Sequence, residues 1–313
     1  MENISPVIKI NGLVKNYKGF SLDIPELEIP QGFATALIGE NGAGKSTLLS
    51  IIAGVRLKYD GKVECFEGKY SDNEKRERMG YVSSNNYFLP SWNLKQVAKG
   101  TGILYEGFSE EKFWKTCEEL SIQKPEGNDN GKPISKLSDG MQMKVMLSSV
   151  FARDTQCLVL DEPASPLDPL MRDCLCNMIR DYLDSKNGEG SVFFSTHNIA
   201  DMESVTDYAI IMEKGKVVEQ GFVDDLKEKF VLIKGDSEDI EKAERILFSI
   251  NKSRYGFEGL CLATDLDKLA GMNVVKEVPS LSQISVAVMK KYTSLKEVEQ
   301  RMEEIPISKR YYH

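Results

Sequence analysis

The sequence predicts an α/β protein with helices around a largely parallel sheet, and three observations predict this fold class. Short apolar runs alternate with helix-like stretches along the chain. Several of these runs are apolar at consecutive positions, as expected of strands that are buried on both faces. A glycine-rich stretch at 39–47 lies between one such run and an apolar helical pattern, so a tight turn is expected to join a strand to a helix there.

Five apolar runs are expected to form strands. They are VIKI (7–10), FATALI (33–38), CLVL (157–160), SVFFS (191–195) and YAIIM (208–212). A helix is expected after Asp168, because Pro169 suits a first helical turn and apolar residues recur at helical spacing from Met171 to Leu183. Another is expected in LLSIIAG after the glycine-rich stretch, with Gly54 at its C-terminal cap.

Two parts of the chain depart from this alternation. Residues 70–90 are charged and then aromatic, and residues 106–136 are rich in Glu, Lys, Gly and Asn, so a less regular insertion is expected within the α/β core. From about residue 229 the pattern changes to VLIKG, an amphipathic stretch around IEKAERILFSI, and PSLSQISVAVMKKY. This change predicts a small appended domain or subdomain.

The composition is that of a soluble globular protein. The 313 residues are 41% hydrophobic and 28% charged, and no apolar run approaches the roughly 18 residues that a membrane-spanning helix needs. The first residues, MENISPVIKI, lack the layout of a signal peptide, so a cytosolic protein is expected. The net charge of −8 argues against a broad nucleic-acid interface. The six cysteines show no paired CxxC spacing and are expected to be reduced packing residues.

The stretch GENGAGKST is the strongest local signal. Gly39, Gly44, Lys45 and Ser46 satisfy the pattern G-x-x-x-x-G-K-[ST]. The glycines allow successive N–H groups to point at phosphate oxygens, and the helix N-terminus adds partial positive charge. Lys45 can reach the β and γ phosphates, and Ser46 can place its hydroxyl on Mg²⁺. The motif predicts a nucleotide site, without separating ATP from GTP, formed by Gly39, Glu40, Asn41, Gly42, Ala43, Gly44, Lys45, Ser46 and Thr47.

The run CLVLDEPASPLD, residues 157–168, ends an apolar strand in two adjacent carboxylates. Asp161 is predicted to complete the Mg²⁺ shell of the nucleotide. Glu162 is predicted to face the γ-phosphate and to polarise an attacking water as a general base. Adjacent acids at a strand end are also often simply solvated. The glycine-rich motif upstream favours the catalytic interpretation.

Two further stretches carry candidate residues. KLSDGMQMK, residues 136–144, offers Ser138 as a helix N-cap together with a second set of free N–H groups, hence a second anion site. FFSTHN, residues 193–198, places His197 at the end of a strand-like run, in a chain with two histidines. A lone histidine there can also be a polar side chain satisfied by a neighbouring backbone group. Since one nucleotide needs one phosphate-binding loop, the second anion site is surplus within a monomer.

In chain order, GENGAGKST, LSDGM, LVLDEP, SPLD and STH resemble the motifs of the ATP-binding cassette (ABC) ATPases, the nucleotide-binding subunits of ABC transporters. The resemblance covers about residues 6–228. It implies a P-loop NTPase fold of the ABC cassette type: a RecA-like core, an antiparallel β subdomain and a helical subdomain at about 85–145, plus a small C-terminal extension. The expected division is an ABC ATPase cassette at 1–228 and a C-terminal accessory region at 229–313.

The resemblance also implies roles for single residues, with ATP and Mg²⁺ as cofactors. Two cassettes are expected to close head to tail, so that Ser138 and Gly140 bind the γ-phosphate of the ATP on the partner's P-loop. Asp168 is expected to communicate across that interface. His197 is expected to hydrogen-bond the γ-phosphate and to align Glu162 and its water.

Four further positions differ from the family motifs or extend them. Tyr17 in VKNYKGF resembles the aromatic that stacks on adenine, with a packed strand tyrosine as the alternative. Ser84 stands where the family usually has glutamine, and either Ser84 through a bridging water or Asn85 by a one-residue shift could take that role. The signature LSDGM differs from the commonest form, LSGGQ, and the added charge of Asp139 is expected to point outward.

The function implied is ATP hydrolysis that energises a separately encoded integral membrane permease, with the chain bound peripherally at the cytoplasmic face of the membrane. PSLSQISV resembles a helix of single-cassette exporter ATPases, which predicts export of drugs, peptides or lantibiotic-like compounds. The expected partners are the permease and a second cassette, in a homo- or heterodimer, and no nucleic acid is expected. Tyr87, Phe88, Leu89 and Trp92 are a candidate permease surface or, alternatively, core residues of the helical subdomain.

Two other functions stay open. A cytosolic cassette protein that acts on ribosomes or DNA would usually carry two cassettes or a long coiled-coil insertion, whereas this chain has one P-loop motif and no long heptad run. A P-loop kinase or GTPase would not need the LSDG stretch, and the sequence has no NKxD-type guanine motif.

Overall fold

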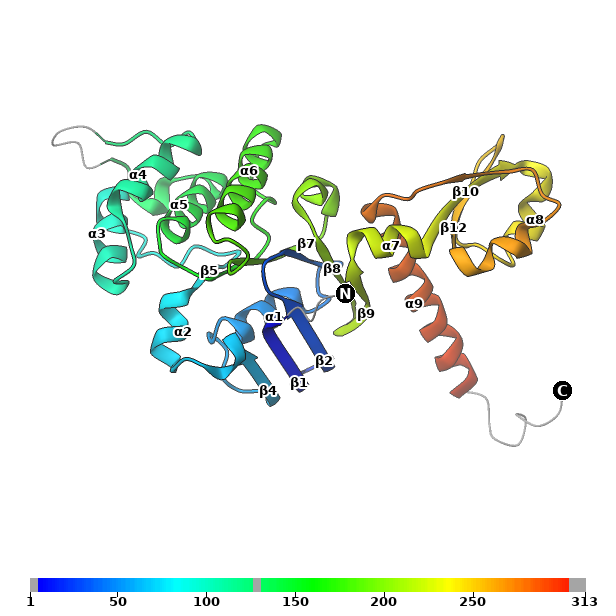
Figure 1. Cartoon of the computed structure of the whole chain (residues 1–313), viewed down its shortest axis with the longest axis horizontal. Helices are drawn as coiled ribbons and strands as arrows, with labels where there is room; N and C mark the ends of the chain where they lie inside the picture. Colours follow the sequence, from blue (N-terminus) through cyan, green and yellow to red (C-terminus); the bar gives the residue numbers. More distant parts are fainter. Residues whose placement is uncertain (1–4, 126–130, 304–313) are drawn as a thin grey trace.

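The computed structural model describes residues 5–125 and 131–303, with side chains placed up to residue 293. Its described strands form three sheets (Figure 1). The central six-stranded sheet has the order β5 (Met79–Val82), β6 (Cys157–Leu160), β7 (Ser191–Thr196), β3 (Ala34–Ile38), β8 (Tyr208–Glu213) and β9 (Lys216–Phe222). A three-stranded antiparallel sheet has the order β2 (Phe20–Pro30), β1 (Pro6–Tyr17) and β4 (Asp60–Cys65).

The central sheet confirms the predicted α/β fold class. Its strands run parallel from β5 to β8, and β9 pairs antiparallel with β8. Every residue of β3, β6 and β7 is buried, in agreement with their continuous apolar sequences. Of the five predicted runs, VIKI lies in β1 and the other four lie in the central sheet.

Residues 70–90 are more regular than expected. Residues 72–78 form α2 (Asp72–Arg78), which begins with a reciprocal capping box between Ser71 and Glu74. Strand β5 follows at once and forms the edge of the central sheet beside β6. Its four residues, MGYV, are too few to show a hydrophobic period, so the expectation of an irregular segment was wrong here.

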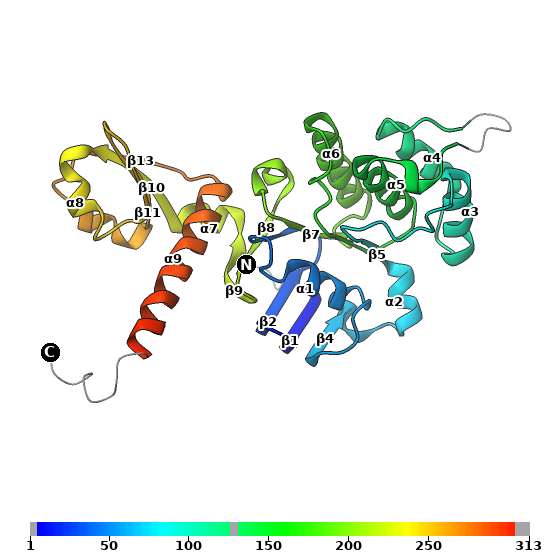
Figure 2. The same ribbon diagram turned by 180° about the vertical axis from the view of Figure 1, so that it is seen from behind.

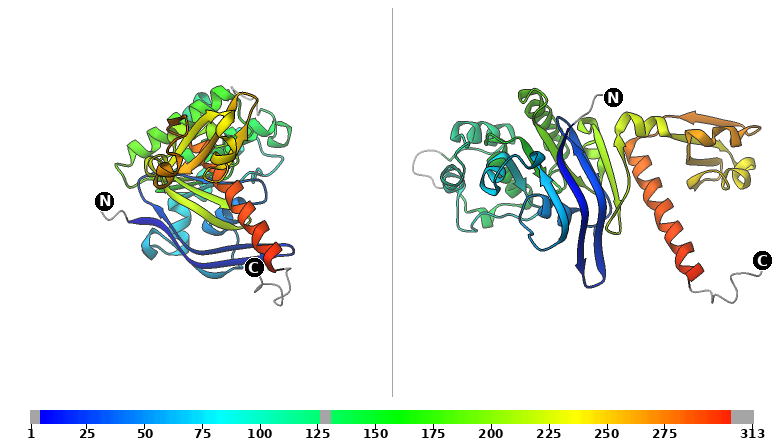
Figure 3. Two further views of the ribbon diagram at one scale, coloured as in Figure 1. Left: turned by 90° about the vertical axis from the view of Figure 1, so that its right-hand side faces the viewer. Right: turned by 60° about the horizontal axis from the view of Figure 1, so that its bottom comes forward.

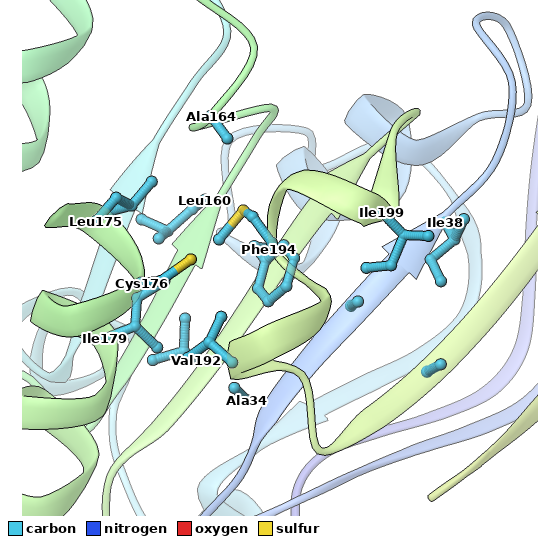
Figure 4. Packing of buried hydrophobic residues seen from close by; sticks show 14 of the residues in the cluster. Ala34, Ile38, Leu160, Ala164, Leu175, Cys176, Ile179, Val192, Phe194 and Ile199 are labelled. Atoms are coloured by element: carbon cyan, nitrogen blue, oxygen red, sulfur yellow. The ribbon is translucent and has the colours of Figure 1, made fainter. Parts of the chain in front are cut away.

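Helices cover both faces of the central sheet. On one face α1 (Lys45–Ile52) and the three-stranded sheet share a buried apolar cluster with the sheet. On the other face α5 (Asp139–Phe151) and α6 (Pro169–Ser185) share a second cluster with it. Figure 4 shows α6 packed against β6 and β7 through Leu175, Ile179, Leu160, Val192 and Phe194.

Both predicted helix starts are confirmed. Asp168 is the N-cap of α6, its Oδ1 accepts a hydrogen bond from the backbone N–H of Met171 at 3.1 Å, and Pro169 is the first helical residue. Helix α1 begins within the glycine-rich stretch, and the chain turns after it at Gly54, where φ is 69°.

The inserted segment contains α3 (Leu94–Leu104), α4 (Glu110–Glu119) and the first part of α5. These helices share their own apolar cluster, which includes Val97, Phe113, Cys117 and Val145. Helix α5 continues past residue 145 to Phe151, and its other side packs under the central sheet. The insertion and the core are therefore joined through one shared helix.

The candidate permease surface divides between the two interpretations. Tyr87 and Leu89 are 46% and 56% exposed. Phe88 and Trp92 are half-buried and pack against the cluster of the inserted helices. Two of the four side chains are thus available to a partner, and two belong to the core.

The C-terminal region forms a separate sheet at one end of the molecule (Figures 1 and 2). After α7 (Val223–Lys229), the sheet has the order β11 (Phe248–Lys252), β12 (Gly256–Leu262), β10 (Phe230–Asp236) and β13 (Val274–Glu277). The amphipathic stretch IEKAERILFSI gives one helical turn, α8 (Ile240–Ala243), and then enters β11. Part of this region packs around its own apolar cluster, whereas Phe230, Leu232 and Leu260 belong to the cluster that includes the cassette core.

The stretch PSLSQISV begins a long helix, α9 (Leu281–Glu303), which starts at the junction of the cassette and the C-terminal sheet (Figure 3). It packs against β11 of the C-terminal sheet and against β8 and β9 of the cassette. Leu281, Ile284 and Ala287 are buried in the same cluster as Ile199 and Met202 of the cassette. The C-terminal region is therefore anchored to the cassette through α9 as well as through β10 and β12.

Short 3-10 helices complete the described elements. They are η1 (Phe66–Gly68), η2 (Ile134–Lys136), η3 (Ile199–Asp201), η4 (Glu203–Val205), η5 (Ser237–Asp239) and η6 (Ala263–Leu269). Among the described residues, no helix has the length and apolar character that crossing a membrane requires. All six cysteines are free, and burial raises the pKa of the Cys65 and Cys117 thiols to about 11, as suits reduced packing residues.

Candidate nucleotide site

The glycine-rich stretch turns tightly from β3 into α1, and three of its glycines are required by the backbone. A Cβ atom at Gly39 would lie 2.6 Å from the carbonyl oxygen of Met212, and one at Gly44 would lie 2.9 Å from the Phe20 ring. The φ angles of Gly42 and Gly44 are 87° and 104°, in the region that side chains disfavour. Gly44 is the N-cap of α1 and offers no side chain to its first N–H groups, so these are left for an anion.

Lys45 lies across the inside of this turn. Its side chain is 5% exposed, and Nζ donates to the carbonyl oxygens of Gly39 at 2.7 Å and Glu40 at 3.2 Å. The same Nζ is 3.2 Å from Oε1 of Glu162. The loop therefore surrounds its buried cation with oxygen atoms, and phosphate oxygens are the same kind of partner.

Asp161 directly follows β6, opposite the start of α1, and is 1% exposed. Its Oδ1 accepts hydrogen bonds from Ser46 Oγ at 3.0 Å and from Ser195 Oγ at 2.7 Å. Hydroxyl and carboxylate oxygens are the ligands that Mg²⁺ prefers, so Ser46 and Asp161 fit that ion as predicted ligands. Burial, and after it the charge of Asp161, raises the pKa of the nearby Tyr81 hydroxyl to about 12.

Ser195 is a site residue that the sequence reasoning missed. Besides donating to Asp161, its Oγ accepts a hydrogen bond from the backbone N–H of Glu162 at 2.9 Å. One buried hydroxyl on β7 thus contacts both carboxylate residues that follow β6. The signal that could have found it is a serine within the apolar run SVFFST, because a polar side chain in a buried strand needs partners.

Glu162 stands between a cation and an imidazole. Oε1 is 3.2 Å from Lys45 Nζ, and Oε2 is 2.7 Å from His197 Nδ1. The residue has a φ of 52°, which is uncommon for any residue but glycine. Its side chain is 16% exposed and that of His197 is 44% exposed, so the pair opens to solvent on the histidine side. A carboxylate fixed in this way can accept a proton from water.

The second predicted anion site lies on α5. Ser138 is the N-cap of α5, and its Oγ accepts a hydrogen bond from the backbone N–H of Met141 at 3.3 Å. Gly140 packs against the loop 163–168, because a Cβ there would lie 2.7 Å from the carbonyl oxygen of Pro166. Asp139 is exposed. Ser138 and Asp168 hydrogen-bond within their own helix ends, so action on a partner's nucleotide stays a prediction.

Tyr17 ends β1 and is 39% exposed. Its hydroxyl accepts a hydrogen bond from Arg56 Nη1 at 3.0 Å, and its ring centroid lies 6.2 Å from that of Phe20. The Phe20 ring in turn lies beside Gly44, where a Cβ atom would be 2.9 Å from it, so Tyr17 lies near the glycine-rich loop. An exposed ring in this place can stack on a base, which keeps the adenine prediction open.

Ser84 and Asn85 follow β5 and are both exposed. Ser83 Oγ closes the turn here, since it accepts from the backbone N–H of Asn85 at 3.1 Å and donates to the Asn85 carbonyl oxygen at 2.7 Å. Both Ser84 and Asn85 line a cavity of about 1040 Å³ that Asp161 also lines. The structure brings both candidates to the edge of the site, and the choice between them stays a prediction.

Known proteins resemble this chain in sequence. The profile of the family described as ABC transporter matches residues 22–165. The nickel import ATP-binding protein NikO of Rhodobacter capsulatus is 30% identical over 231 residues, which covers 70% of this chain and 90% of that protein. The tungstate uptake system ATP-binding protein TupC of Peptoclostridium acidaminophilum is 29% identical, covering 68% and 97%. The lantibiotic transport ATP-binding protein SrtF of Streptococcus pyogenes is 27% identical, covering 68% and 89%.

Solved structures resemble the fold. An ATP-binding subunit of an ABC transporter matches with a TM-score of 0.60 and 24% identity, covering 71% of this chain and 92% of that chain. The dimeric post-hydrolysis state of the ATP-binding cassette MJ0796 with ADP and Pi matches with a TM-score of 0.59 and 19% identity, covering 69% and 98%. The family profile, the match to NikO and the cassette fold together show that the chain belongs to the family of ABC transporter ATP-binding subunits.

Proposed function

We propose that this chain binds and hydrolyses Mg-ATP as one half of a cassette dimer and energises a separately encoded integral membrane permease, bound at its cytoplasmic face. One observation carries the hydrolytic part. Just after β6, Glu162 Oε1 lies 3.2 Å from Lys45 Nζ, and Oε2 lies 2.7 Å from His197 Nδ1. The residue before it, Asp161, accepts a hydrogen bond from Ser46 Oγ. A base, a cation and a metal-binding pair meet at one strand end.

Binding follows from the loop. Lys45 and the free N–H groups at the start of α1 would hold the phosphate chain, and Ser46 and Asp161 would hold Mg²⁺. When bound, Mg²⁺ neutralises charge on the β and γ phosphates. Tyr17 would stack on adenine at the rim. Lys45 would then exchange its contact with Glu162 for phosphate oxygens, which would free the carboxylate for water.

Hydrolysis follows from the Glu162–His197 pair. Glu162 would accept a proton from the attacking water while His197 fixes the orientation of the carboxylate through Oε2. His197 would also donate to the γ-phosphate, where negative charge develops. Ser138 and Gly140 of the partner cassette would complete the site, and Asp168 would lie at the interface between the two cassettes.

The proposal also includes a direction of transport, which is export. The C-terminal helix that begins with PSLSQISV and the similarity to SrtF, whose name gives lantibiotic transport, support export of drugs, peptides or lantibiotic-like compounds. The names of NikO and TupC give nickel import and tungstate uptake, and they support import as the second candidate.

The test is reconstitution with the permease encoded nearest to this chain. The purified chain and that permease are placed in liposomes with the cassettes outside, and ATP hydrolysis is measured with Mg²⁺ and with EDTA. We expect a rate that rises severalfold over the chain alone and disappears with EDTA. An exporter would carry labelled nisin into the lumen, whereas an importer would release preloaded Ni²⁺ or tungstate from it. Stimulation by ribosomes or DNA in place of the permease would favour the cytosolic alternative.

A further inference from the structure

Arg172, on the first turn of α6, contacts two separate segments of the site. Its Nε donates to the carbonyl oxygens of Ala164 at 3.2 Å and Leu167 at 2.9 Å, in the loop that follows Glu162. Its Nη1 lies 2.7 Å from Oδ1 of Asp201, in the segment that follows His197. One guanidinium therefore joins the segments that carry the two predicted catalytic residues.

Further hydrogen bonds connect the contacts of Arg172 to the residues beside each predicted catalytic side chain. On the histidine side, Asp201 Oδ2 accepts a hydrogen bond from Nδ2 of Asn198, the residue next to His197, at 3.0 Å. On the glutamate side, the loop turns back on itself, since the N–H of Ser165 donates to the carbonyl oxygen of Glu162 at 3.2 Å. Short chains of hydrogen bonds and backbone thus connect Arg172 to Glu162 and to His197, whose side chains are 2.7 Å apart.

The chemistry of this contact suits arginine in particular. The guanidinium is planar and always charged, and it can donate in two directions at once with fixed geometry. A lysine could pair with Asp201 but could not also donate along the Nε direction to the two carbonyls. The side chains of Arg172 and Asp201 are 27% and 21% exposed, so the pair is largely shielded from solvent and ions.

We propose that Arg172, through Asp201, is a positioning residue that fixes the Glu162 loop relative to the His197 segment for ATP hydrolysis. The loop 163–168 also carries Asp168, so the same side chain links the predicted cassette interface to the Glu162–His197 pair. This inference rests on the proposed ATPase function and adds a residue to it. Arg172 touches neither predicted substrate nor metal ligands, and it acts by placing others.

The chain offers a matched control on the same helix. Arg180 lies two turns further along α6 and contacts the same following segment, since Nη2 donates to Ser204 Oγ at 3.0 Å and to the Ser204 carbonyl oxygen at 3.1 Å. In the described part of the chain, the Arg180 guanidinium donates to Asn177 and Ser204 and not to the loop 163–168 or to Asp201. If anchoring this segment to α6 were the whole role of Arg172, the loss of Arg180 would have a similar effect.

The experiment compares the full-length wild type with Arg172→Met, Arg172→Lys, Asp201→Asn, Arg180→Met and the double variant Arg172→Met/Asp201→Asn. It measures kcat and KM for ATP, binding of the fluorescent nucleotide TNP-ATP, and thermal unfolding. We expect Arg172→Met to lower kcat by at least about tenfold, because small misplacements of catalytic groups cost that much or more, with TNP-ATP affinity within about twofold of wild type. Arg172→Lys should restore part of kcat, and Arg180→Met should keep it.

The double variant tests whether Arg172 and Asp201 act as a pair. If they do, its kcat should equal that of Arg172→Met rather than show the product of the two single losses. A kcat of Arg172→Met within about twofold of wild type would overturn the proposal, as would equal losses in the Arg172 and Arg180 variants. If Arg172→Met does not fold, Asp201→Asn decides, and a kcat within about twofold of wild type in that variant would overturn the proposal. A wild type without ATPase activity would instead overturn the proposed function.

Discussion

The cassette and the C-terminal region differ in what they bury. The cassette buries charged side chains, namely Lys45, Lys144, Arg153, Asp161 and Glu213. In the described C-terminal residues, 230–293, the buried polar residue is Ser285, whose hydroxyl donates to the Leu281 carbonyl oxygen at 2.7 Å within α9. The interior of the C-terminal sheet is otherwise apolar.

The buried charged groups lie in the region with the predicted catalytic site, and the C-terminal sheet has an apolar interior. A buried charge is costly unless it is paired or hydrogen-bonded. Lys45 and Asp161 are each held by several partners, and they lie where the nucleotide is predicted. The C-terminal sheet carries no such cost and no such groups in its described part. Substitutions in the cassette should therefore affect catalysis as well as stability, whereas those in the C-terminal sheet should affect stability alone.

The largest effect is expected for Glu162→Gln in the cassette. The amide keeps the shape of the side chain but cannot accept a proton from water, so turnover should fall by a factor of about 100 to 10,000 while ATP binding remains. The closed dimer should then accumulate with ATP. Phosphate release and gel filtration with Mg-ATP measure the two effects.

The exposed Glu189→Gln is the matched control, because it makes the same chemical change far from the site. It should hydrolyse ATP like the wild type. A Glu162→Gln variant that is monomeric with Mg-ATP and turns over at the wild-type rate would remove Glu162 as the base.

The second prediction tests whether each ATP site combines the P-loop of one chain with Ser138 of the other. Lys45→Ala should inactivate the P-loop, and Ser138→Arg should block the signature stretch by its bulk. If Ser138 works on the partner's ATP, a mixed dimer has one site with both lesions and one with neither. Mixing the inactive proteins should then restore up to about half of the wild-type activity per mixed dimer, at protein concentrations that saturate dimer formation.

A mixture without activity has two explanations, which a cross-link distinguishes. In a background without other reactive cysteines, Ser138→Cys on one chain and Ser46→Cys on the other should form a disulfide between chains when ATP is present. With the cross-link, an inactive mixture means that both sites must fire together. Without it, the head-to-tail arrangement is wrong.

Much of the cassette could be predicted because its signals are local. Strands buried on both faces appear as apolar runs, and the P-loop appears as glycines at fixed spacing, since the backbone at Gly39 and Gly44 leaves no room for a Cβ. The ends of β6 and β7 then place Asp161, Glu162 and His197 at the same edge, because carboxyl ends of parallel strands meet there.

The remainder depends on contacts between distant segments. Strand β5 is too short for a pattern, and Ser195 is known as a site residue from its two partners across the sheet. Arg172 carries no signal in the helical pattern of α6, because its contacts with Ala164, Leu167 and Asp201 depend on the fold. The return of α9 to the cassette likewise has no local signal.

The third prediction compares one truncation in the two regions. Ile38 ends β3 just before the P-loop and Ile233 lies in β10, and they are 1% and 0% exposed. Each isoleucine-to-alanine change should cost about 2–5 kcal/mol of stability, because it removes buried methyl groups and leaves a cavity. Below the unfolding temperature, Ile38→Ala should also reduce ATP turnover, whereas Ile233→Ala should keep it.

Thermal unfolding and ATPase rates of the same samples test this comparison. Val275→Ala, at a position that is 60% exposed on β13, is the control and should change stability by less than about 0.5 kcal/mol. Loss of turnover in a folded Ile233→Ala variant would mean that the C-terminal sheet takes part in catalysis, and the separation between the regions would be wrong.

The smallest effect is expected for Ser84→Ala, at the rim of the cassette site. If Ser84 reaches the metal through a water, its loss should slow ATP hydrolysis by less than about tenfold, or under ~1.4 kcal/mol of barrier. Asn85→Ala should then have the larger effect, because its amide is the alternative to the usual glutamine. Both side chains are exposed and line the same cavity, so each truncation should leave the fold intact and the ATPase rates can be compared directly. An inactive Ser84→Ala beside a normal Asn85→Ala would reject the one-residue shift and assign the glutamine position to Ser84.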